Sequence, residues 1–151
     1  MPVRKALVPV DGSEMANKAA RLAARFAAEH GWEVVLLYVL EHPPMPSFAF
    51  PSDVKETALR ELREEGRRIL REAEKLFTAA DVTVTHKLVE GSAAEMIAAE
   101  VETGGYGIIA LGSTGLGRGK LGLLVLGSVA EQVIRTVKVP ILLVTEATEL
   151  D

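Results

Sequence analysis

Five short apolar runs divide the chain, and turn residues or polar segments bound each of them. They are too short for buried helices, so they predict the strands of a sheet. Residues 82–89 alternate apolar with polar side chains in part, which is typical of a strand with one exposed face or at a sheet edge. The five predicted strands cover residues 5–10, 33–39, 82–89, 106–111 and 139–145.

The segments between the predicted strands repeat apolar residues at the spacing of amphipathic helices. The first, residues 13–30, carries a narrow stripe of alanines that would let a helix lie close against a sheet. The second, residues 53–77, has a leucine-rich stripe expected to face inward along its whole length, including Leu59 and Leu62. Arg60–Glu64 and Glu64–Arg68 are predicted i,i+4 charge pairs on its solvent side.

The other two helices are predicted to begin at capping boxes, in which a serine and a glutamate three residues later satisfy free N–H groups. Ser92 and Glu95 form such a pair before a helix expected to end near Val101. Ser128 and Glu131 form the second pair. Ser128 is therefore predicted to cap the last helix.

Strands and helices alternate along the whole sequence, and this order predicts an α/β fold. We expect a five-stranded, mostly parallel open sheet with helices on both faces. The 151 residues suit a single domain, 1–151, which the proline-containing loop 41–52 interrupts without dividing. In such sheets ligands bind beyond the carboxyl ends of the strands, where the winding reverses. Asp11 and Gly112 follow predicted strands at such ends.

Composition restricts the class of partner. The net charge of -4 gives no overall attraction to nucleic acid or anionic lipid, and no apolar run approaches the roughly 20 residues of a membrane span. The chain has no cysteine, and its first residues lack the pattern of a signal peptide. We therefore expect a cytoplasmic protein with small-molecule or protein partners, without nucleic acid or membrane. The three histidines are too scattered to predict a metal site.

Six of the 13 glycines lie in the segment 112–128. Glycine lets backbone N–H groups face an anion, and the helix expected at Ser128 adds free N–H groups and a positive dipole end. The segment is not a Walker loop, because Thr114 stands where the first glycine belongs and Leu121 follows Lys120. It nevertheless predicts a phosphate site.

A dinucleotide fingerprint is matched literally by Gly117, Gly119 and Gly122. The match begins several residues after the predicted strand, and four apolar residues separate it from the capped helix. The strand-turn-helix context that gives the fingerprint its meaning is therefore missing.

Motifs along essentially the whole chain resemble the universal stress protein family. ATP-binding members carry G-x-x-G, nine residues, and then G-[ST], and parts of this pattern match Gly112, Gly115, Gly127 and Ser128. The resemblance implies a nucleotide-binding, flavodoxin- or Rossmann-like three-layer sandwich of the adenine nucleotide alpha hydrolase type. Further matches are residues 8–13, 37–39, 89–93 and 139–144.

The glycine spacing departs from the family pattern, since eleven residues rather than nine separate Gly115 from Gly127. Either the loop is two residues longer, or Gly117 takes the place of the second glycine and Thr114 that of the first. The first alternative keeps Gly112 at the strand end and is preferred.

The resemblance also implies ATP as the ligand, together with Mg²⁺. Apart from it, Asp11 is a candidate turn residue and Ser128 a candidate helix cap. The implied site residues are Pro9, Asp11 and Val39 at the adenosine end, Gly112 and Gly115 near the ribose and phosphates, and Gly127, Ser128 and Val129 at the phosphates, with Gly117 and Arg118 as further candidates from the same loop.

The expected function is that of an ATP-binding regulatory or stress-response protein with slow or no ATP hydrolysis. Self-phosphorylation at Ser113, Thr114 or Ser128 stays open, because positioning alone contributes to phosphoryl transfer. The alternative is a protein-interaction module that needs no nucleotide. The apolar last strand, Val139–Thr145, predicts a homodimer, since an exposed apolar edge invites pairing. The sequence identifies no other protein partner.

Overall fold

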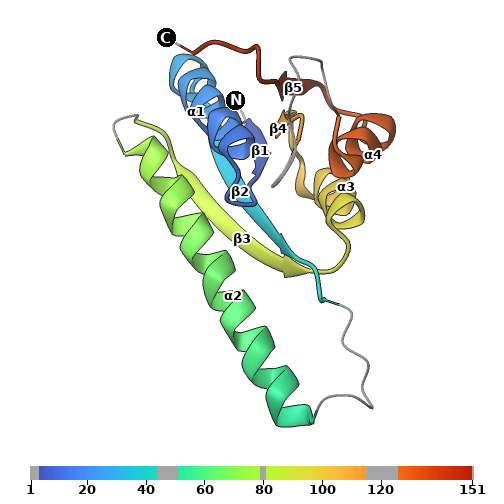
Figure 1. Cartoon of the computed structure of the whole chain (residues 1–151). Coiled ribbons are helices and arrows are strands. Elements are labelled where there is room, and N and C mark those ends of the chain that lie inside the picture. The colour runs from blue at the N-terminus through green and yellow to red at the C-terminus, as the bar shows by residue number, and fades with distance from the viewer. Residues whose placement is uncertain (1–3, 44–50, 79–80, 115–125, 151) are drawn as a thin grey trace.

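The computed structural model describes residues 4–43, 51–78, 81–114 and 126–150, and its elements alternate as predicted (Figure 1). A 3₁₀ turn, η1 (Lys75–Phe77), continues the second helix. The strands are β1 (Lys5–Pro9), β2 (Glu33–Leu40), β3 (Val84–Glu90), β4 (Ile108–Gly112) and β5 (Ile141–Val144). The helices are α1 (Glu14–His30), α2 (Ser52–Glu74), α3 (Ala93–Gly104) and α4 (Ser128–Thr136).

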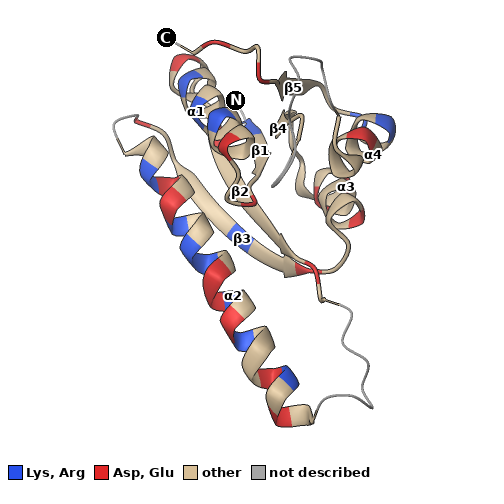
Figure 2. Ribbon diagram, viewed as in Figure 1, with Lys and Arg blue, Asp and Glu red and all other residues tan. Residues whose placement is uncertain are grey.

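The solvent face of α2 is highly charged, but its ion pairs differ from the predicted ones (Figure 2). Arg67 Nη1 lies 2.6 Å from Glu64 Oε1, and Arg68 Nε lies 2.9 Å from Glu65 Oε2. Both pairs are i,i+3, so the predicted i,i+4 pairs Arg60–Glu64 and Glu64–Arg68 were wrong. Both spacings bring side chains to the same helix face, and each arginine pairs with the glutamate one turn before it. These pairs are exposed and contribute little to stability.

The inward stripe of α2 is confirmed only for its second half. Ile69, Leu70 and Ala73 are buried, whereas Leu59 and Leu62 stay half-exposed. The first half of the helix extends beyond the sheet (Figure 1). The predicted burial of these two leucines was wrong because helical spacing identifies an apolar face but not how far the partner sheet reaches.

Both predicted capping boxes are absent. Ser92 is the N-cap of α3, but its side chain makes no capping hydrogen bond. In α4 the N-cap is Gly127, whose carbonyl accepts the Glu131 N–H at 3.0 Å. Ser128 is therefore the first helical residue and not the cap, because the helix begins one residue earlier than the motif suggests.

The strands form one sheet in the order β3-β2-β1-β4-β5, and every neighbouring pair is parallel. The chain passes outward from β1 through β2 to β3 and then returns to the other side of β1. The winding therefore reverses between β1 and β4. The predicted five-stranded parallel sheet is confirmed, and β3 lies at an edge as its alternating pattern indicated.

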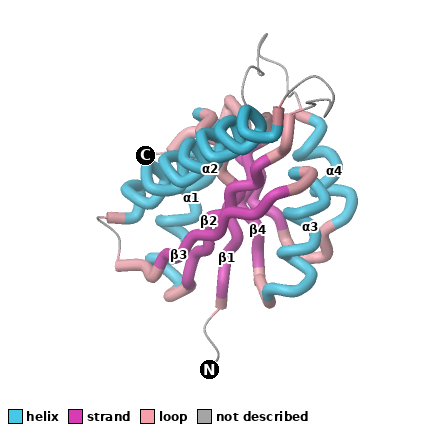
Figure 3. Tube along the Cα trace, turned by 90° about the horizontal axis from the view of Figure 1, so that it is seen from below, coloured by secondary structure: helices cyan, strands magenta, loops and turns pink. Residues whose placement is uncertain are grey.

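Two apolar layers flank the sheet, so the three-layer arrangement is confirmed as well. α1 and α2 cover one face, and α3 and α4 cover the other (Figure 3). Successive residues of a strand face opposite layers, as in β1, where Ala6 and Val8 face α1 and Leu7 faces α3. None of the helices in the described part of the chain combines the length and apolar character needed to cross a bilayer.

The small side chains of α1 bring its first turn very close to the end of β4. Its buried face is built mainly of alanines, as predicted. A β-carbon added to Gly112 would lie 3.0 Å from the Met15 carbonyl carbon, tighter than almost all real contacts of this kind. Glycine at the end of β4 therefore permits the close approach of α1, and this approach shapes the site described below.

Candidate functional site

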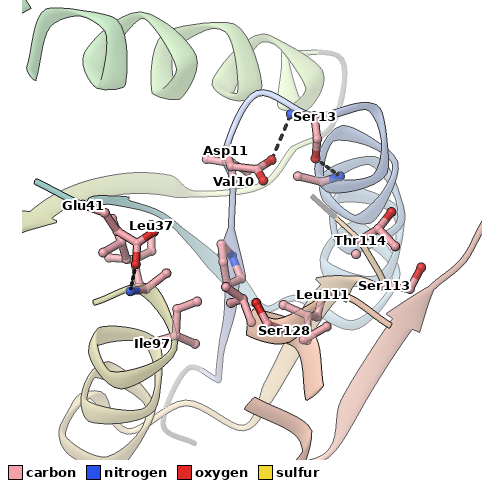
Figure 4. A pocket seen from close by; sticks show the side chains of 18 residues that line it. Val10, Asp11, Ser13, Leu37, Glu41, Ile97, Leu111, Ser113, Thr114 and Ser128 are labelled. Atoms are coloured by element: carbon pink, nitrogen blue, oxygen red, sulfur yellow. Dashed lines mark hydrogen bonds between the residues drawn. The ribbon is translucent and has the colours of Figure 1, made fainter. Parts of the chain in front are cut away.

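A cavity of about 250 Å³ lies where the winding of the sheet reverses, at the carboxyl ends of β1, β2 and β4 (Figure 4). Its walls join apolar side chains to a small number of polar groups, a combination typical of small-molecule sites. The apolar lining residues are Pro9, Val10, Ala16, Leu37, Val39, Ala93, Ile97, Leu111, Val129 and Ala130, and the remainder are Asp11, Ser13, Glu41, Gly112, Ser113, Thr114, Gly127 and Ser128.

The cavity brings together most of the residues that the resemblance implied. Gly115, Gly117 and Arg118 lie outside the described residues, so the two alignments of the glycine pattern stay open. Their role as ligands, like that of the others, stays a prediction. Those that line the cavity are Pro9, Asp11, Val39, Gly112, Gly127, Ser128 and Val129.

Asp11 shapes the turn that leads from β1 into α1. Its Oδ1 accepts the Ser13 N–H at 2.9 Å, and Ser13 Oγ in turn accepts the Ala16 N–H at 3.2 Å. Gly12 between them has a φ of 87°, which glycine adopts without strain. The turn role of Asp11 is confirmed, and it coexists with the position of Asp11 in the cavity wall.

The end of β4 anchors the start of α4. The Ser113 N–H donates to the Val144 carbonyl at 2.8 Å, and the Ser113 carbonyl accepts the Gly127 N–H at 2.8 Å. Ser113 and Thr114 are both buried, with 2% and 7% of their surface exposed. Ser113 is thus held at the cavity by backbone hydrogen bonds with β5 and with the N-cap of α4, and the buried Thr114 follows it in the cavity wall.

The N-terminus of α4 is open toward the cavity. Within the described ranges, the backbone N–H groups of Ser128, Val129 and Ala130 donate no hydrogen bond. Ser128 Oγ likewise has no partner there. Gly127 has no side chain that could close the helix end. Free N–H groups at a helix N-terminus favour an anion, because they carry the positive end of the helix dipole.

Sequence reasoning missed Glu41, which lies directly after β2. Its Oε2 accepts the Ala93 N–H at the first residue of α3, at 3.0 Å, and its side chain lines the cavity. The signal that could have found it is its position, since Asp11 follows β1 at the same edge of the sheet. The apolar residues Leu37, Ile97 and Leu111 were missed too, because nothing distinguishes them from other core positions.

A charged cluster joins three elements beside the cavity. Glu90, at the end of β3, accepts hydrogen bonds from Arg63 Nε of α2 at 2.8 Å and from His42 Nε2 at 2.7 Å. These two hydrogen bonds, that of Arg63 first, lower the pKa of Glu90 to about 2. The carboxylate therefore stays ionised at neutral pH. None of the three residues lines the cavity, and the cluster connects the end of β2 to α2 and β3.

No group of three or more histidine, aspartate or glutamate side chains in the described ranges could hold a metal ion. His42 is hydrogen-bonded to Glu90, and His86 Nε2 lies 3.9 Å from Glu74 Oε2.

Comparison with known proteins agrees with this geometry. The family model described as the universal stress protein family matches residues 2–145. A universal stress protein of Methanocaldococcus jannaschii is 33% identical over 144 residues, covering 93% of this chain and 81% of that protein. Both matches extend over nearly the whole length of the chain, and the family model spans the cavity residues.

Solved structures share the fold. The universal stress protein UspA from Lactobacillus plantarum superposes with a TM-score of 0.81 at 20% identity, covering 95% of this chain and 99% of that one. A universal stress protein from Archaeoglobus fulgidus, solved in complex with dAMP, has a TM-score of 0.69 at 18% identity, covering 95% and 98%. Sequence, fold and family model agree, and the chain belongs to the universal stress protein family.

Proposed function

We propose that this chain binds ATP, together with Mg²⁺, in the cavity between β1 and β4 and acts as a regulatory or stress-response protein. The observation that carries the proposal is the open N-terminus of α4 at one side of an otherwise largely apolar cavity. An adenine nucleotide has the matching chemistry, since it joins an apolar planar base to a strongly anionic phosphate chain.

The apolar part of the cavity suits the base. Aliphatic walls come from the residue after β1, from β2 and from α3, through Val10, Leu37, Val39 and Ile97. Aliphatic walls with a few polar groups are the usual environment of small-molecule ligands. The predicted placement of Pro9, Asp11 and Val39 at the adenosine end is consistent with this arrangement.

The phosphates would lie at the start of α4. The N–H groups of Ser128, Val129 and Ala130, which have no partner among the described residues, and the hydroxyl of Ser128 supply hydrogen-bond donors there. The arrangement is that of other phosphate sites at helix N-termini. Mg²⁺ would be held chiefly by phosphate oxygens, because Mg²⁺ in nucleotide sites commonly binds through the phosphates and water.

Slow or no hydrolysis is part of the proposal. Asp11 and Glu41 are the carboxylates among the described lining residues, and each already accepts a backbone N–H. These hydrogen bonds tie both carboxylates to helix N-termini, and neither is placed as a general base by any contact among the described residues. Self-phosphorylation would need the γ-phosphate to reach Ser113, Thr114 or Ser128 in line.

The dAMP complex of the fold neighbour from Archaeoglobus fulgidus supports an adenine nucleotide as the ligand class. At 18% identity that likeness extends to the fold alone, so the proposal rests on the cavity of this chain.

The nucleotide proposal is tested on the purified protein. We expect denaturation to release adenine nucleotide, detectable by chromatography of the supernatant. Addition of Mg-ATP to the nucleotide-free protein should raise the melting temperature, because a ligand at 100 times its Kd stabilises the folded state by about 2.7 kcal/mol. If no nucleotide is released and Mg-ATP causes no thermal shift, the proposal fails and the nucleotide-independent interaction module takes its place.

We further propose a homodimer formed through the segment Val139–Thr145. β5 lies at an edge of the sheet, and three of its apolar residues, Ile141, Leu142 and Leu143, are only partly buried. An apolar edge strand is stabilised by pairing with a second copy. Sedimentation at micromolar concentration is expected to show a dimer, and a monomer there would contradict the proposal.

A further inference from the structure

Three helices begin at the cavity, and their N-termini differ in how the chain closes them. Ser13 closes α1 through its hydroxyl, which accepts the Ala16 N–H. Glu41 closes α3 through its carboxylate, which accepts the Ala93 N–H. Among the described residues, no side chain closes the N-terminus of α4 in this way. A helix N-terminus attracts anions through its N–H groups. At α1 and α3 a side chain already accepts one of these N–H groups, so α4 offers a ligand more donors.

Glu41 differs from Ser13 in bringing a negative charge. Its side chain reaches Ala93 from the end of β2, across 52 positions of sequence. It lies on one side of the cavity, whereas Ser113 and Thr114 lie on the other (Figure 4). The second carboxylate of the lining, Asp11, also follows a strand on the β1–β2 side. The acidic groups of the lining thus follow β1 and β2, whereas the side of β4 and α4 is rich in donors.

We propose that Glu41 is a specificity-determining residue of this cavity. Its carboxylate occupies the N-terminus of α3 and repels anionic groups from that side, so that a bound nucleotide places its phosphates at α4. Glu41 thereby sets the direction in which the nucleotide lies. This assignment rests on the proposed function. The repulsion of a simple anion by Glu41 does not depend on it.

The size of the effect follows from charge and exposure. Glu41 is exposed to solvent, so its field is screened, and at 0.1 M salt the Debye length is about 10 Å. The repulsion grows with the charge of the ligand, so it should discriminate ATP from adenosine and weaken at high salt.

The first experiment compares Glu41→Gln with Glu95→Gln. Glutamine at position 41 keeps an oxygen acceptor for the Ala93 N–H but removes the charge. Glu95→Gln removes the same charge from the first turn of α3, where the exposed side chain does not line the cavity. Binding of adenosine, AMP and ATP would be measured by calorimetry at low and high salt.

We expect Glu41→Gln to raise the affinity for ATP about three- to tenfold at low salt, with less than about a twofold change for adenosine. Glu95→Gln should change either affinity by less than about twofold. An unchanged ratio of ATP to adenosine affinity in Glu41→Gln, equal to that of Glu95→Gln, would overturn the proposal. Failure of the unaltered protein to bind any of the three ligands would overturn the nucleotide function instead.

The second experiment uses inorganic phosphate and does not depend on nucleotide binding. Amide chemical shifts would be followed by NMR during a phosphate titration of the unaltered protein and of Glu41→Ala. In the unaltered protein we expect Ser128, Val129 and Ala130 to shift while Ala93 does not. In Glu41→Ala, Ala93 should respond as well. A response of Ala93 in the unaltered protein, or none in Glu41→Ala, would show that Glu41 does not govern this end.

Discussion

Replacing Ser128 with aspartate is expected to weaken ATP binding about ten- to hundredfold, equivalent to about 1.4 to 2.8 kcal/mol, while leaving α4 at least as stable. The added carboxylate would lie at the first residue of α4, where the proposed phosphates meet the free N–H groups. It would repel the phosphates directly. The same charge interacts favourably with the helix dipole, typically by about 0.3 to 1 kcal/mol.

The matched control is Ser128→Asn, which has nearly the shape of the aspartate variant without its charge. Calorimetry should show a much smaller loss of ATP affinity for the asparagine variant. Adenosine, which has no phosphate, should bind both variants with similar affinity. Thermal unfolding would report the stability of each. Equal ATP affinity in the aspartate and asparagine variants would contradict the proposed position of the phosphates at the start of α4.

Truncating Ile109 to alanine is expected to lower the free energy of unfolding by about 2 to 5 kcal/mol. Ile109 is fully buried in β4, where it pairs with Leu7 of β1 and Ile141 of β5. Its side chain belongs to the layer between the sheet and the pair α3 and α4. The free energy of unfolding of a domain is typically about 5 to 15 kcal/mol, so the substitution would remove a large share of the stability.

The comparison variant is Ile134→Ala, which deletes the same atoms from α4 at a position 38% exposed to solvent. Its cost should stay below about 1 kcal/mol, because little apolar surface leaves the core. Urea unfolding of both variants gives the two free energies. A loss in Ile134→Ala as large as that in Ile109→Ala would mean that the two core layers are assigned wrongly.

Most of the fold followed from local patterns. Apolar patterns predicted every described strand and α-helix, because burial of one face imposes the same spacing wherever the element lies. The alanine stripe of α1 predicted that this helix packs closely against the sheet. At Gly112, at the end of β4, α1 lies so close that a β-carbon would have little room. The order of elements also placed Asp11 and Gly112 at the reversal of the winding, where the cavity lies.

Helix caps were predicted less well, although the motifs are local. Ser92 lies at the N-cap of α3, yet the capping partner of Ala93 is Glu41. A capping motif identifies side chains that can reach the helix end, but it does not identify competitors that arrive from elsewhere in the chain. In α4 the start moved by one residue, so that Gly127 replaced Ser128 as the cap.

The sequence by itself determined the family, the alternation of strands and helices, and the edge of the sheet at which the cavity forms. The tertiary structure alone decided which side chains close the helix N-termini in the described part of the chain. Glu41 meets α3, and Arg63 of α2 meets Glu90 of β3, only because parallel strands bring their carboxyl ends to one edge. Such contacts join residues 52 and 27 positions apart, a separation that no local periodicity records.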